Sequence, residues 1–443
     1  MIDVNRQDSR LSAHGSQVSI EVLRPGLLTT VQDRGRFGYQ KFGVPVSGAV
    51  DEIALRVANM LVGNPQGAAA LEATVLGPQL RFLTDTVVAL TGAVVEADLD
   101  GKPVPWYESF RVRPRQVLHI RKCPRGLRAY LAIAGGIDVP VLLGSRSTCL
   151  IASFGGFRGR ALAAGDVLAV GPPSAPLPEL TGREAPSPWR PRHESRVTVR
   201  VILGPQDDAF AEEGIRTFLE SGYRVTPNSD RMGYRLDGPV IRHQGSPDII
   251  SDWIPLGGVQ VPGDGKPIIL LADRQTTGGY TKIATVIRPD LSLVAQLRPG
   301  DTLAFQAVSV VEAQAIACKI EADLLALPDH LVTAESWTYA AELGEVPGGI
   351  SLALQGDLPQ ATPTVMESPG RATVRCPMPA VVVRVLIDAG DMVAVGQPLF
   401  LLQAMKMEFE VAAPRAGCLV EVNVREGDAV GADDVMASLD TTA

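Results

Sequence analysis

The most informative stretch of the chain is Gln403-Ala404-Met405-Lys406-Met407-Glu408, near its C-terminus. Apolar runs lie on both sides of it, at 398–402 and at 409–413. Two such runs around a short turn predict a β-hairpin with Lys406 at its tip. Lys406 is the only lysine between residues 371 and 443. A single exposed lysine on a tight hairpin is suited to carry a covalently attached group into another protein's active site.

The sequence around this hairpin repeats at an offset of 37 residues. Residues 381–393 align with residues 418–430, and Pro377 aligns with Pro414. Each copy contains a turn, a strand rich in β-branched residues, a Gly-Asp turn and a further apolar run. Neither copy could bury its apolar face alone. The repeat therefore predicts a pseudo-twofold β-sandwich in which Lys406 lies on the link between the halves.

Residues 371–443 resemble the biotinyl domain of biotin-dependent carboxylases. In that family the lysine of an Ala-Met-Lys-Met motif is biotinylated, and here Lys406 stands between Met405 and Met407. Residues 376–380 resemble the family's Pro-Met-Pro turn, with cysteine and alanine as departures. The resemblance implies biotin bound covalently to Lys406 and a biotin ligase that attaches it. Two alternatives remain: a lipoyl domain, whose lysine usually follows an acidic residue, and an ordinary surface lysine.

The composition limits the class of protein. The chain has 443 residues, enough for two or three domains. Its 44 glycines and 34 prolines favour short strands and turns over long helices. The net charge is −8 and no basic run occurs, so neither nucleic acid nor an anionic membrane is an expected partner. No apolar run approaches the length that crosses a membrane.

The cysteines and histidines predict neither disulfides nor a metal site. The five cysteines are far apart and form no Cys-x-x-Cys, which predicts a reduced, cytoplasmic protein. The five histidines show no zinc-binding spacing.

The pattern along the chain predicts a disordered leader, a large β-rich region and a C-terminal domain joined by a linker. Val18–Leu23 alternates as an edge strand would, and apolar positions between Ile53 and Val62 predict a helix. The segment 172–195 is rich in proline, serine and arginine and predicts a linker between two β-rich halves. The predicted boundaries are 1–17 for the leader, about 18–171 and 196–310 for the halves, 310–327 for a helix, 328–370 for the linker and 371–443 for the biotinyl domain.

Asp273–Lys282 is the stretch of the large region with the most chemistry. It follows the apolar strand Ile268–Ala272 and holds an acid, two cations, a phenol and two glycines. Such a set can hold a small polar substrate and stabilise negative charge at a carbonyl. It equally fits an ion-pair network at the end of a strand. Residues 33–41 echo this pattern with Asp-Arg, Gly-Tyr and lysine, and Gly144–Thr148 predicts either an anion-binding turn or a plain loop.

Residues 20–310 are similar to the carboxyltransferase family that includes the C subunit of 5-oxoprolinase and the corresponding half of the urea amidolyase carboxyltransferase. The resemblance rests on five motifs, at 29–36, 43–48, 61–64, 229–235 and 272–280. It implies a mainly β fold of cyclophilin-like β-barrel units, beside the biotinyl/lipoyl-type β-sandwich. It also implies a partner that resembles the B subunit of 5-oxoprolinase. Some members have been described as regulators of a kinase inhibitor.

These observations predict the carboxyltransferase component of a biotin-dependent carboxylase. The chain lacks a Walker A motif and a dinucleotide fingerprint, so a separate biotin carboxylase is expected to load the biotin. The expected acceptor is a small nitrogen compound such as urea, a guanidino compound or 5-oxoproline. The candidate residues are Asp273 as base or orienting group, Arg274, Tyr280 and Lys282 for anion stabilisation, and Asp33, Arg34, Arg231 and Arg235 as second choices.

Two other functions stay open from the sequence. One is a component of ATP-dependent 5-oxoproline hydrolysis, similar to the 5-oxoprolinase C subunit, without biotin chemistry. The other is a non-catalytic carrier or regulatory protein whose large region only docks partners.

Overall fold

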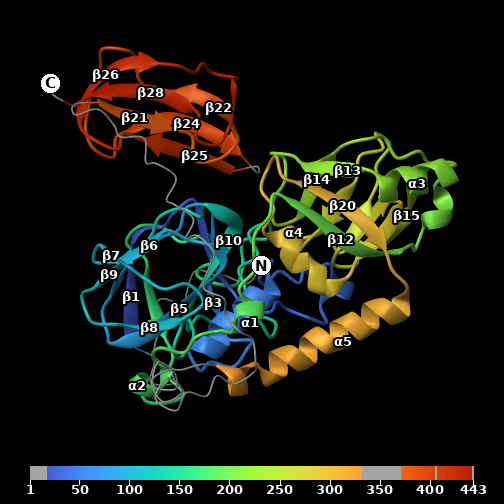
Figure 1. Cartoon of the computed structure of the whole chain (residues 1–443), viewed down its shortest axis with the longest axis horizontal. Coiled ribbons are helices and arrows are strands. Elements are labelled where there is room, and N and C mark those ends of the chain that lie inside the picture. The colour runs from blue at the N-terminus through green and yellow to red at the C-terminus, as the bar shows by residue number, and fades with distance from the viewer. Residues whose placement is uncertain (1–16, 332–370, 405–406, 442–443) are drawn as a thin grey trace, which may run out of the picture. The chain divides into compact units, whose positions relative to one another are not determined.

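The structure is a computed structural model that describes residues 17–331, 371–404 and 407–441 (Figure 1). The chain divides into two compact units, Met1–Ala334 and Glu335–Ala443. Strands dominate both, which confirms the prediction of a mainly β fold. No helix in the described ranges combines the length and the apolar character that crossing a membrane requires.

The first half of the first unit is built from two antiparallel sheets. The six-stranded sheet has the order β11 (Val167–Val170), β1 (Gln17–Arg24), β4 (Gln79–Phe82), β9 (Val117–Ile120), β6 (Ala97–Leu99) and β7 (Lys102–Pro103). The five-stranded sheet has the order β2 (Leu28–Gln32), β3 (Ala70–Thr74), β10 (Arg125–Ile133), β5 (Thr86–Val94) and β8 (Ser109–Val112). Short helices in this half are η1 (Gln40–Phe42), α1 (Glu52–Leu61), α2 (Leu177–Leu180) and η2 (Ser187–Trp189).

The five-stranded sheet is buried on both faces because its strands are apolar at successive positions. On β5, Val88 and Leu90 pack into the core shared with the six-stranded sheet, whereas Val87 and Ala89 pack against α1. Successive side chains of a strand point to opposite faces. A strand between two layers therefore needs an unbroken apolar run instead of an alternating one.

Two predictions about this half are wrong. Val18–Leu23 lies in β1, which is not an edge strand: it pairs with β11 on one side and β4 on the other. The segment 172–195 is not a free linker, because Leu180 and Ala185 are buried in the cluster around α1. A few apolar side chains are enough to anchor a proline-rich segment whose composition otherwise suggests a tether.

The second half is a closed barrel. Its strand order is β12 (Arg196–Leu203), β19 (Lys282–Val286), β16 (Gly258–Gln260), β17 (Ile268–Leu270), β14 (Gly233–Asp237), β13 (Gly222–Val225) and β20 (Thr302–Ala307). The pair β12–β20 that closes it is parallel. Outside the barrel lie the ribbon of β15 (Asp248–Trp253) and β18 (Thr277–Tyr280), and the helices η3 (Asp207–Ala209), α3 (Glu212–Glu220), η4 (Arg288–Asp290) and α4 (Leu291–Ala295).

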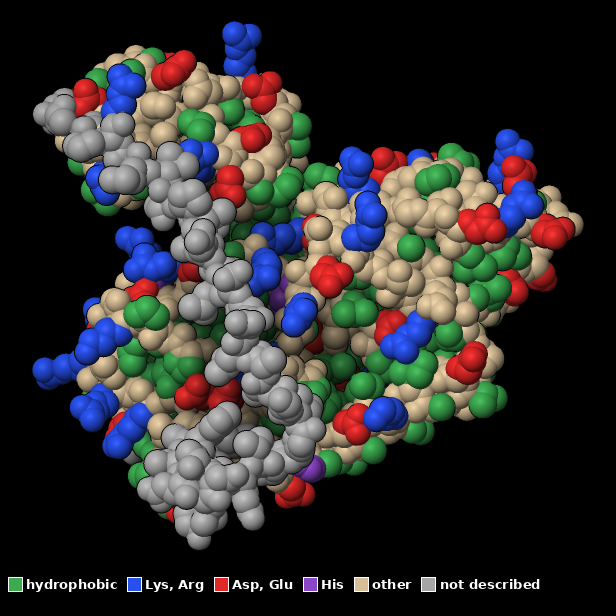
Figure 2. Space-filling model, viewed as in Figure 1, with side chains coloured by type: hydrophobic (Ala, Val, Ile, Leu, Met, Phe, Trp, Pro, Cys, Tyr) green, Lys and Arg blue, Asp and Glu red, His purple; other side chains and the backbone are tan. Residues whose placement is uncertain are grey.

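Helix α5 (Val310–Ala326) connects the two halves of the first unit (Figure 1). The predicted helix is confirmed, and a capping box between Ser309 and Glu312 starts it. At its other end, Leu324 and Leu327 are buried in the cluster around α1, Leu327 within η5 (Leu327–His330). The helix thus runs from the last barrel strand back to the first half. On the face that Figure 2 shows, acidic and basic side chains are interspersed over the barrel half.

The second unit consists of two four-stranded sheets. One has the order β21 (Arg371–Arg375), β28 (Val435–Asp440), β26 (Gly417–Val422) and β23 (Met392–Val393). The other has the order β25 (Met407–Ala412), β24 (Pro398–Ala404), β22 (Ala380–Val385) and β27 (Ala429–Val430).

The register of these sheets confirms the predicted pseudo-twofold repeat. Val381 pairs with Gln403 in one sheet, and Cys418 pairs with Asp440 in the other, each position shifted by the same 37 residues. The other pairs of these two ladders, the break in their register included, follow the same shift. The repeat therefore sets strand order, pairing and register together.

Candidate functional site

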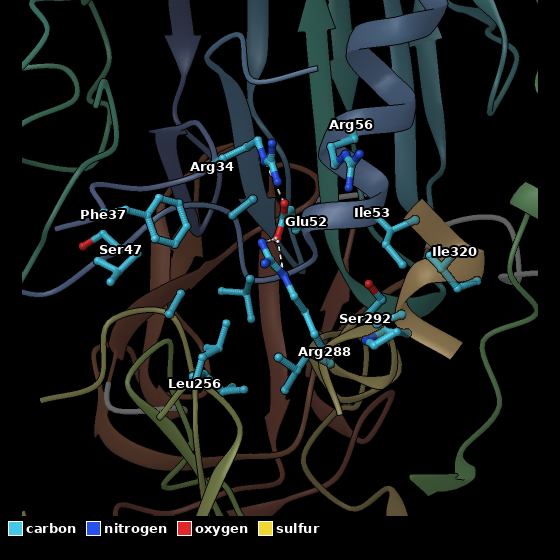
Figure 3. A pocket seen from close by; sticks show the side chains of 18 of the residues that line it. Arg34, Phe37, Ser47, Glu52, Ile53, Arg56, Leu256, Arg288, Ser292 and Ile320 are labelled. Carbon is cyan, nitrogen blue, oxygen red and sulfur yellow. Dashed lines mark hydrogen bonds and ion pairs between the residues drawn. The ribbon is translucent and has the colours of Figure 1, made fainter. Parts of the chain in front are cut away.

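A cavity of about 270 Å³ lies in the first unit, between the loop after β2, helix α1, the segment after β17 and helix α5 (Figure 3). Its wall contains apolar side chains such as Val46, Leu256 and Leu324. Its charged side chains are four arginines and two glutamates: Arg34, Arg56, Arg274, Arg288, Glu52 and Glu321. The wall has a net positive charge in a chain whose net charge is −8.

Three of the arginines are paired. Glu52 lies between two of them, with its Oε1 2.7 Å from Arg34 Nε and its Oε2 2.6 Å from Arg288 Nη2 (Figure 3). Arg56 makes two 2.7 Å hydrogen bonds to the carboxylate of Glu321 on α5. Hydrogen bonding to Arg56 lowers the pKa of Glu321. These pairs connect α1 to η4 and to α5, so they fix three sides of the cavity.

Arg274 differs from these three because no carboxylate among the described residues pairs with it. It is 6% exposed, and its Nε donates to the carbonyl oxygen of Ile254 at 3.0 Å and its Nη1 to that of Leu271 at 3.3 Å. Burial lowers the pKa of Arg274 to about 10. The side chain is therefore still a cation at neutral pH, and it can bind an anion in the cavity.

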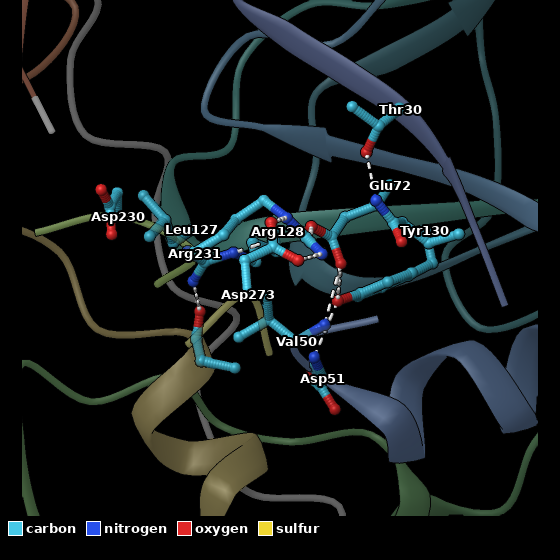
Figure 4. Close-up of polar contacts among 12 residues, drawn as sticks. Thr30, Val50, Asp51, Glu72, Leu127, Arg128, Tyr130, Asp230, Arg231 and Asp273 are labelled. Atoms are coloured by element: carbon cyan, nitrogen blue, oxygen red, sulfur yellow. Dashed lines mark hydrogen bonds and ion pairs between the residues drawn. The ribbon is translucent and has the colours of Figure 1, made fainter. Parts of the chain in front are cut away.

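A buried ion network lies beside the cavity and joins the two halves of the first unit (Figure 4). Arg231 donates its Nε to Asp273 at 2.9 Å and contacts Glu72 of β3 through Nη1. Its Nη2 donates to the carbonyl oxygen of Gly48 at 2.7 Å. Burial alone would lower the pKa of Arg231, but the charges of Asp273 and Glu72 outweigh it and raise the pKa. Arg231 therefore stays charged.

Glu72 is the centre of this network. Its Oε2 accepts hydrogen bonds from Tyr130 Oη at 2.7 Å and from the backbone N–H of Val50 at 3.0 Å. Burial raises its pKa, but the charges of Arg231 and Arg128 outweigh burial, and the net shift lowers it. The network holds the strand that carries Glu72 against the loop at Val50, which leads into α1.

For Gly144–Thr148 the sequence left open an anion-binding turn and a plain loop; in the structure the turn binds a carboxylate of the same chain, that of Asp33. The carboxylate of Asp33 accepts from Ser145 Oγ at 2.7 Å and from the backbone N–H of Arg146 at 2.6 Å. It also accepts from Ser147 Oγ and from the backbone N–H of Gly35. In this position Asp33 fixes the loop that carries Arg34, and it does not line the cavity.

The remaining predicted residues lie apart from the cavity wall. Lys282 is buried, with its Nζ 3.1 Å from Asp252 Oδ2. Tyr280 is 42% exposed on the ribbon strand β18, and Arg235 is exposed on β14. Of the eight candidates, the structure brings Arg34 and Arg274 to the cavity and joins Asp273 with Arg231 beside it. Their catalytic roles remain predictions.

Four charged residues of the cavity were missed from the sequence: Glu52, Arg56, Arg288 and Glu321. Glu52 and Arg56 are four residues apart on α1, directly after the loop motif that ends at Gly48, and this spacing could have placed them on one helix face. Arg288 follows β19 in an ordinary Arg-Pro-Asp turn, and no local signal distinguishes it.

The predicted hairpin in the second unit is confirmed up to its tip. Strands β24 and β25 pair until Ala404 and Met407 face each other. Met405 and Lys406, which connect these two residues, lie outside the described residues. No group of three or more His, Cys, Asp or Glu that could hold a metal ion occurs in the described part of the chain, and the five cysteines are free.

Comparisons with known proteins assign both units. The family described as "Carboxyltransferase domain, subdomain A and B" matches residues 42–307, and "Biotin-requiring enzyme" matches residues 372–439. The C subunit of 5-oxoprolinase from Haemophilus influenzae is 39% identical over 302 residues, which cover 68% of this chain and 95% of that protein. The chain belongs to the carboxyltransferase family of subdomains A and B.

A solved structure and a carrier protein extend the comparison. The crystal structure of the K. lactis urea amidolyase is 36% identical, with a TM-score of 0.66, and the match covers 71% of this chain and 20% of that one. The biotin carboxyl carrier protein of Streptococcus mutans is 40% identical over 67 residues, 15% of this chain and 52% of that protein. The second unit is therefore a biotinyl domain, and its cofactor is covalently attached biotin.

Proposed function

We propose that the chain is the carboxyltransferase component of a biotin-dependent carboxylase that acts on a small urea-type or amide-type acceptor. The observation that carries the proposal is the combination, in one chain, of an arginine-rich cavity in a carboxyltransferase fold with a biotinyl domain. A separate biotin carboxylase supplies the carboxyl group, and a partner that resembles the B subunit of 5-oxoprolinase completes the assembly. The unpaired cysteines agree with a cytoplasmic location, which remains part of the proposal.

The hairpin of the biotinyl domain suits the attachment of biotin to Lys406. The pairing of Ala404 with Met407 leaves only Met405 and Lys406 between the two strands, and Lys406 has the only side-chain amine of the domain. When bound, biotin supplies a carboxyl group that its ureido nitrogen carries. The acceptor nitrogen takes this carboxyl group, and the ureido nitrogen takes the proton that the acceptor nitrogen loses. Because both units belong to one chain, biotin on Lys406 would be presented to the first unit at a high effective concentration.

The residues of the first unit bind and orient in this proposal. Arg274 provides a buried positive charge for a carboxylate, in a site where water screens it little. Asp273 is the orienting group: Arg231 holds its side chain, and its backbone N–H donates to the carbonyl oxygen of Arg231 at 3.0 Å. These contacts fix the position of Arg274, the next residue. Arg34 and Arg288 add positive charge nearer to solvent.

The similarity to the C subunit of 5-oxoprolinase favours a second candidate function. That relative matches the first unit over nearly its whole length. The chain could then be a component of ATP-dependent 5-oxoproline hydrolysis, in which the biotinyl domain has no part. The two functions differ in their requirement for one residue: carboxyl transfer requires Lys406, and hydrolysis does not.

A transfer assay tests the proposal. The chain is co-expressed with a biotin ligase, and intact-mass analysis should show one biotin on the wild type and none on Lys406→Arg. Labelled bicarbonate, ATP, a biotin carboxylase and the partner are then added with candidate acceptors. We expect transfer with the wild type, none with Lys406→Arg, and a loss of at least about tenfold with Arg274→Met. Lys319→Met, on the exposed face of α5, is the matched control.

Two results would contradict the proposal. Full 5-oxoproline hydrolysis by Lys406→Arg would support the second candidate. Unchanged transfer by Arg274→Met would mean that the cavity does not take part, as in a protein that only docks its partners.

A further inference from the structure

Ser47 is a polar residue of the cavity wall whose side chain no described protein group satisfies. It is 4% exposed, and its Oγ has no hydrogen-bond partner among the described residues. Its backbone has a φ of 55°, in the left-handed region that residues other than glycine rarely adopt. A buried hydroxyl without a partner and a strained backbone are each unfavourable. Together at one residue of a cavity wall, they indicate a side chain held in place for a ligand.

The surrounding structure fixes Ser47 next to Arg274. The backbone N–H of Ser47 donates to the carbonyl oxygen of Ala272 at 3.1 Å, two residues before Arg274. Arg231 holds the carbonyl oxygen of Gly48, on the other side of Ser47. A Cβ at Gly48 would lie 2.8 Å from the backbone of Arg34, so only glycine lets these two chain segments approach so closely. Ser47 and Arg274 therefore both line the same cavity, on two chain segments that are hydrogen-bonded to each other.

The chemistry of this pair suits a carboxylate. Arg274 offers a cation that has no carboxylate partner among the described residues, and Ser47 offers a hydroxyl donor; a carboxylate can accept from both. Side chains around them, such as Val46 and Leu271, are apolar and suit a short carbon skeleton. A neutral acceptor such as urea would leave the charge of Arg274 uncompensated.

We infer that the acceptor carries a carboxylate group of its own, which Arg274 and Ser47 bind while its amide or ureido nitrogen receives the carboxyl group. This inference rests on the proposed function and specifies its substrate class as a small ureido or amide acid. The transferred carboxyl group meets other arginines: Arg34 and Arg288 share Glu52 nearer to solvent, where Arg288 is 56% exposed. The cavity thus has positive charge for two carboxylates.

Calorimetric binding of matched ligands to the full-length biotinylated chain tests this inference. N-carbamoylglycine is a ureido acid, N-carbamoylglycinamide is its neutral amide, and urea has neither group. We expect the acid to bind at least about tenfold more tightly than the amide or urea, as the loss of a charged hydrogen bond implies. Arg274→Met should remove this preference, Ser47→Ala should reduce it several-fold, and Arg274→Lys should restore it in part. Arg81→Met, in a surface ion pair with Glu21, should leave it unchanged.

The outcomes separate this inference from the proposed function. Equal affinity for the acid, the amide and urea would overturn the inference, and carboxyl transfer to urea could still stand. The chain could prefer the acid through Arg274 and yet transfer no carboxyl group to any acceptor. This result would support the anion site and reject the transfer function. Thermal unfolding shows whether Arg274→Met folds. If it does not fold, the affinities of the wild type and of Ser47→Ala for the three ligands test the inference.

Discussion

Replacing Arg231 by methionine should destabilise the first unit strongly. The substitution removes the cation that contacts Asp273 and Glu72 in the buried network. Glu72 keeps partners, because Arg128 Nε lies 3.9 Å from it and Tyr130 donates a hydrogen bond. Asp273 loses both of its side-chain hydrogen bonds and is 2% exposed, and Arg36 interacts with it only through its charge.

The magnitude follows from this asymmetry. A buried charge that loses its partner costs about 3–5 kcal/mol. A domain of ordinary stability has an unfolding free energy of about 5–15 kcal/mol, so the loss is a large fraction of the total. In the double variant Arg231→Met/Asp273→Asn the uncompensated charge is gone, and we expect it to recover at least about half of the loss.

Urea denaturation followed by tryptophan fluorescence measures this effect. Trp106, Trp189 and Trp253 lie in the first unit, and residues 371–443 contain no tryptophan. The fourth tryptophan, Trp337, belongs to the second unit and is replaced by phenylalanine in every protein compared in this assay. A single variant that loses less than about 1 kcal/mol, the value of a surface ion pair, would refute the reasoning. A double variant no more stable than the single one would refute it as well, because the cost would then not arise from the carboxylate of Asp273.

Two further predictions concern acid stability and the pseudo-twofold repeat. The pKa of Glu72 is lowered from 4.5, so its ionisation stabilises the first unit fully above pH 4.5, and this contribution is lost as the pH falls through the lowered folded-state pKa. The urea concentration at the unfolding midpoint should therefore fall less steeply between pH 6 and pH 3 in Glu72→Gln than in the wild type. An equally steep fall in both proteins would contradict this. Leu402 and Leu439 are repeat partners, both fully buried, so Leu402→Ala and Leu439→Ala should each cost the second unit about 2–5 kcal/mol. Hydrogen exchange of β24 and β28 measures the loss of unfolding free energy in each variant. Two losses that differ by more than about 2 kcal/mol would show that the two halves of the repeat do not contribute equally to stability.

The sequence predicts well what short-range patterns determine. The hairpin around Lys406 follows from two apolar runs, and the sandwich follows from a 37-residue repeat that its strand register confirms. Helix α5 follows from its periodicity. In each case the residues that decide the structure are close in sequence, or are copies of one another.

The sequence predicts poorly where strands and charges find partners far along the chain. Val18–Leu23 has the alternation of an edge strand, but its neighbours β11 and β4 come from residues 167–170 and 79–82. The turn at 144–148 does bind an anion, and that anion, Asp33, is over 100 residues earlier. Glu72 and Arg231 are 159 residues apart. Composition shows that such groups need partners, but not which partners they have.

The charge of the cavity depends on helix α5 in a way that no local motif reveals. Arg56 is 5% exposed, and its carboxylate partner, Glu321, belongs to this helix. Among the 17 residues of α5 only Ala313 and Leu324 are buried, so its packed face is small and the ion pair matters for its position. Without α5 the cavity would hold a second buried arginine lacking a counter-ion. With α5 in place, Arg274 is the buried arginine of the cavity that has no carboxylate partner among the described residues, and a bound anion gains most there, beside the unsatisfied hydroxyl of Ser47.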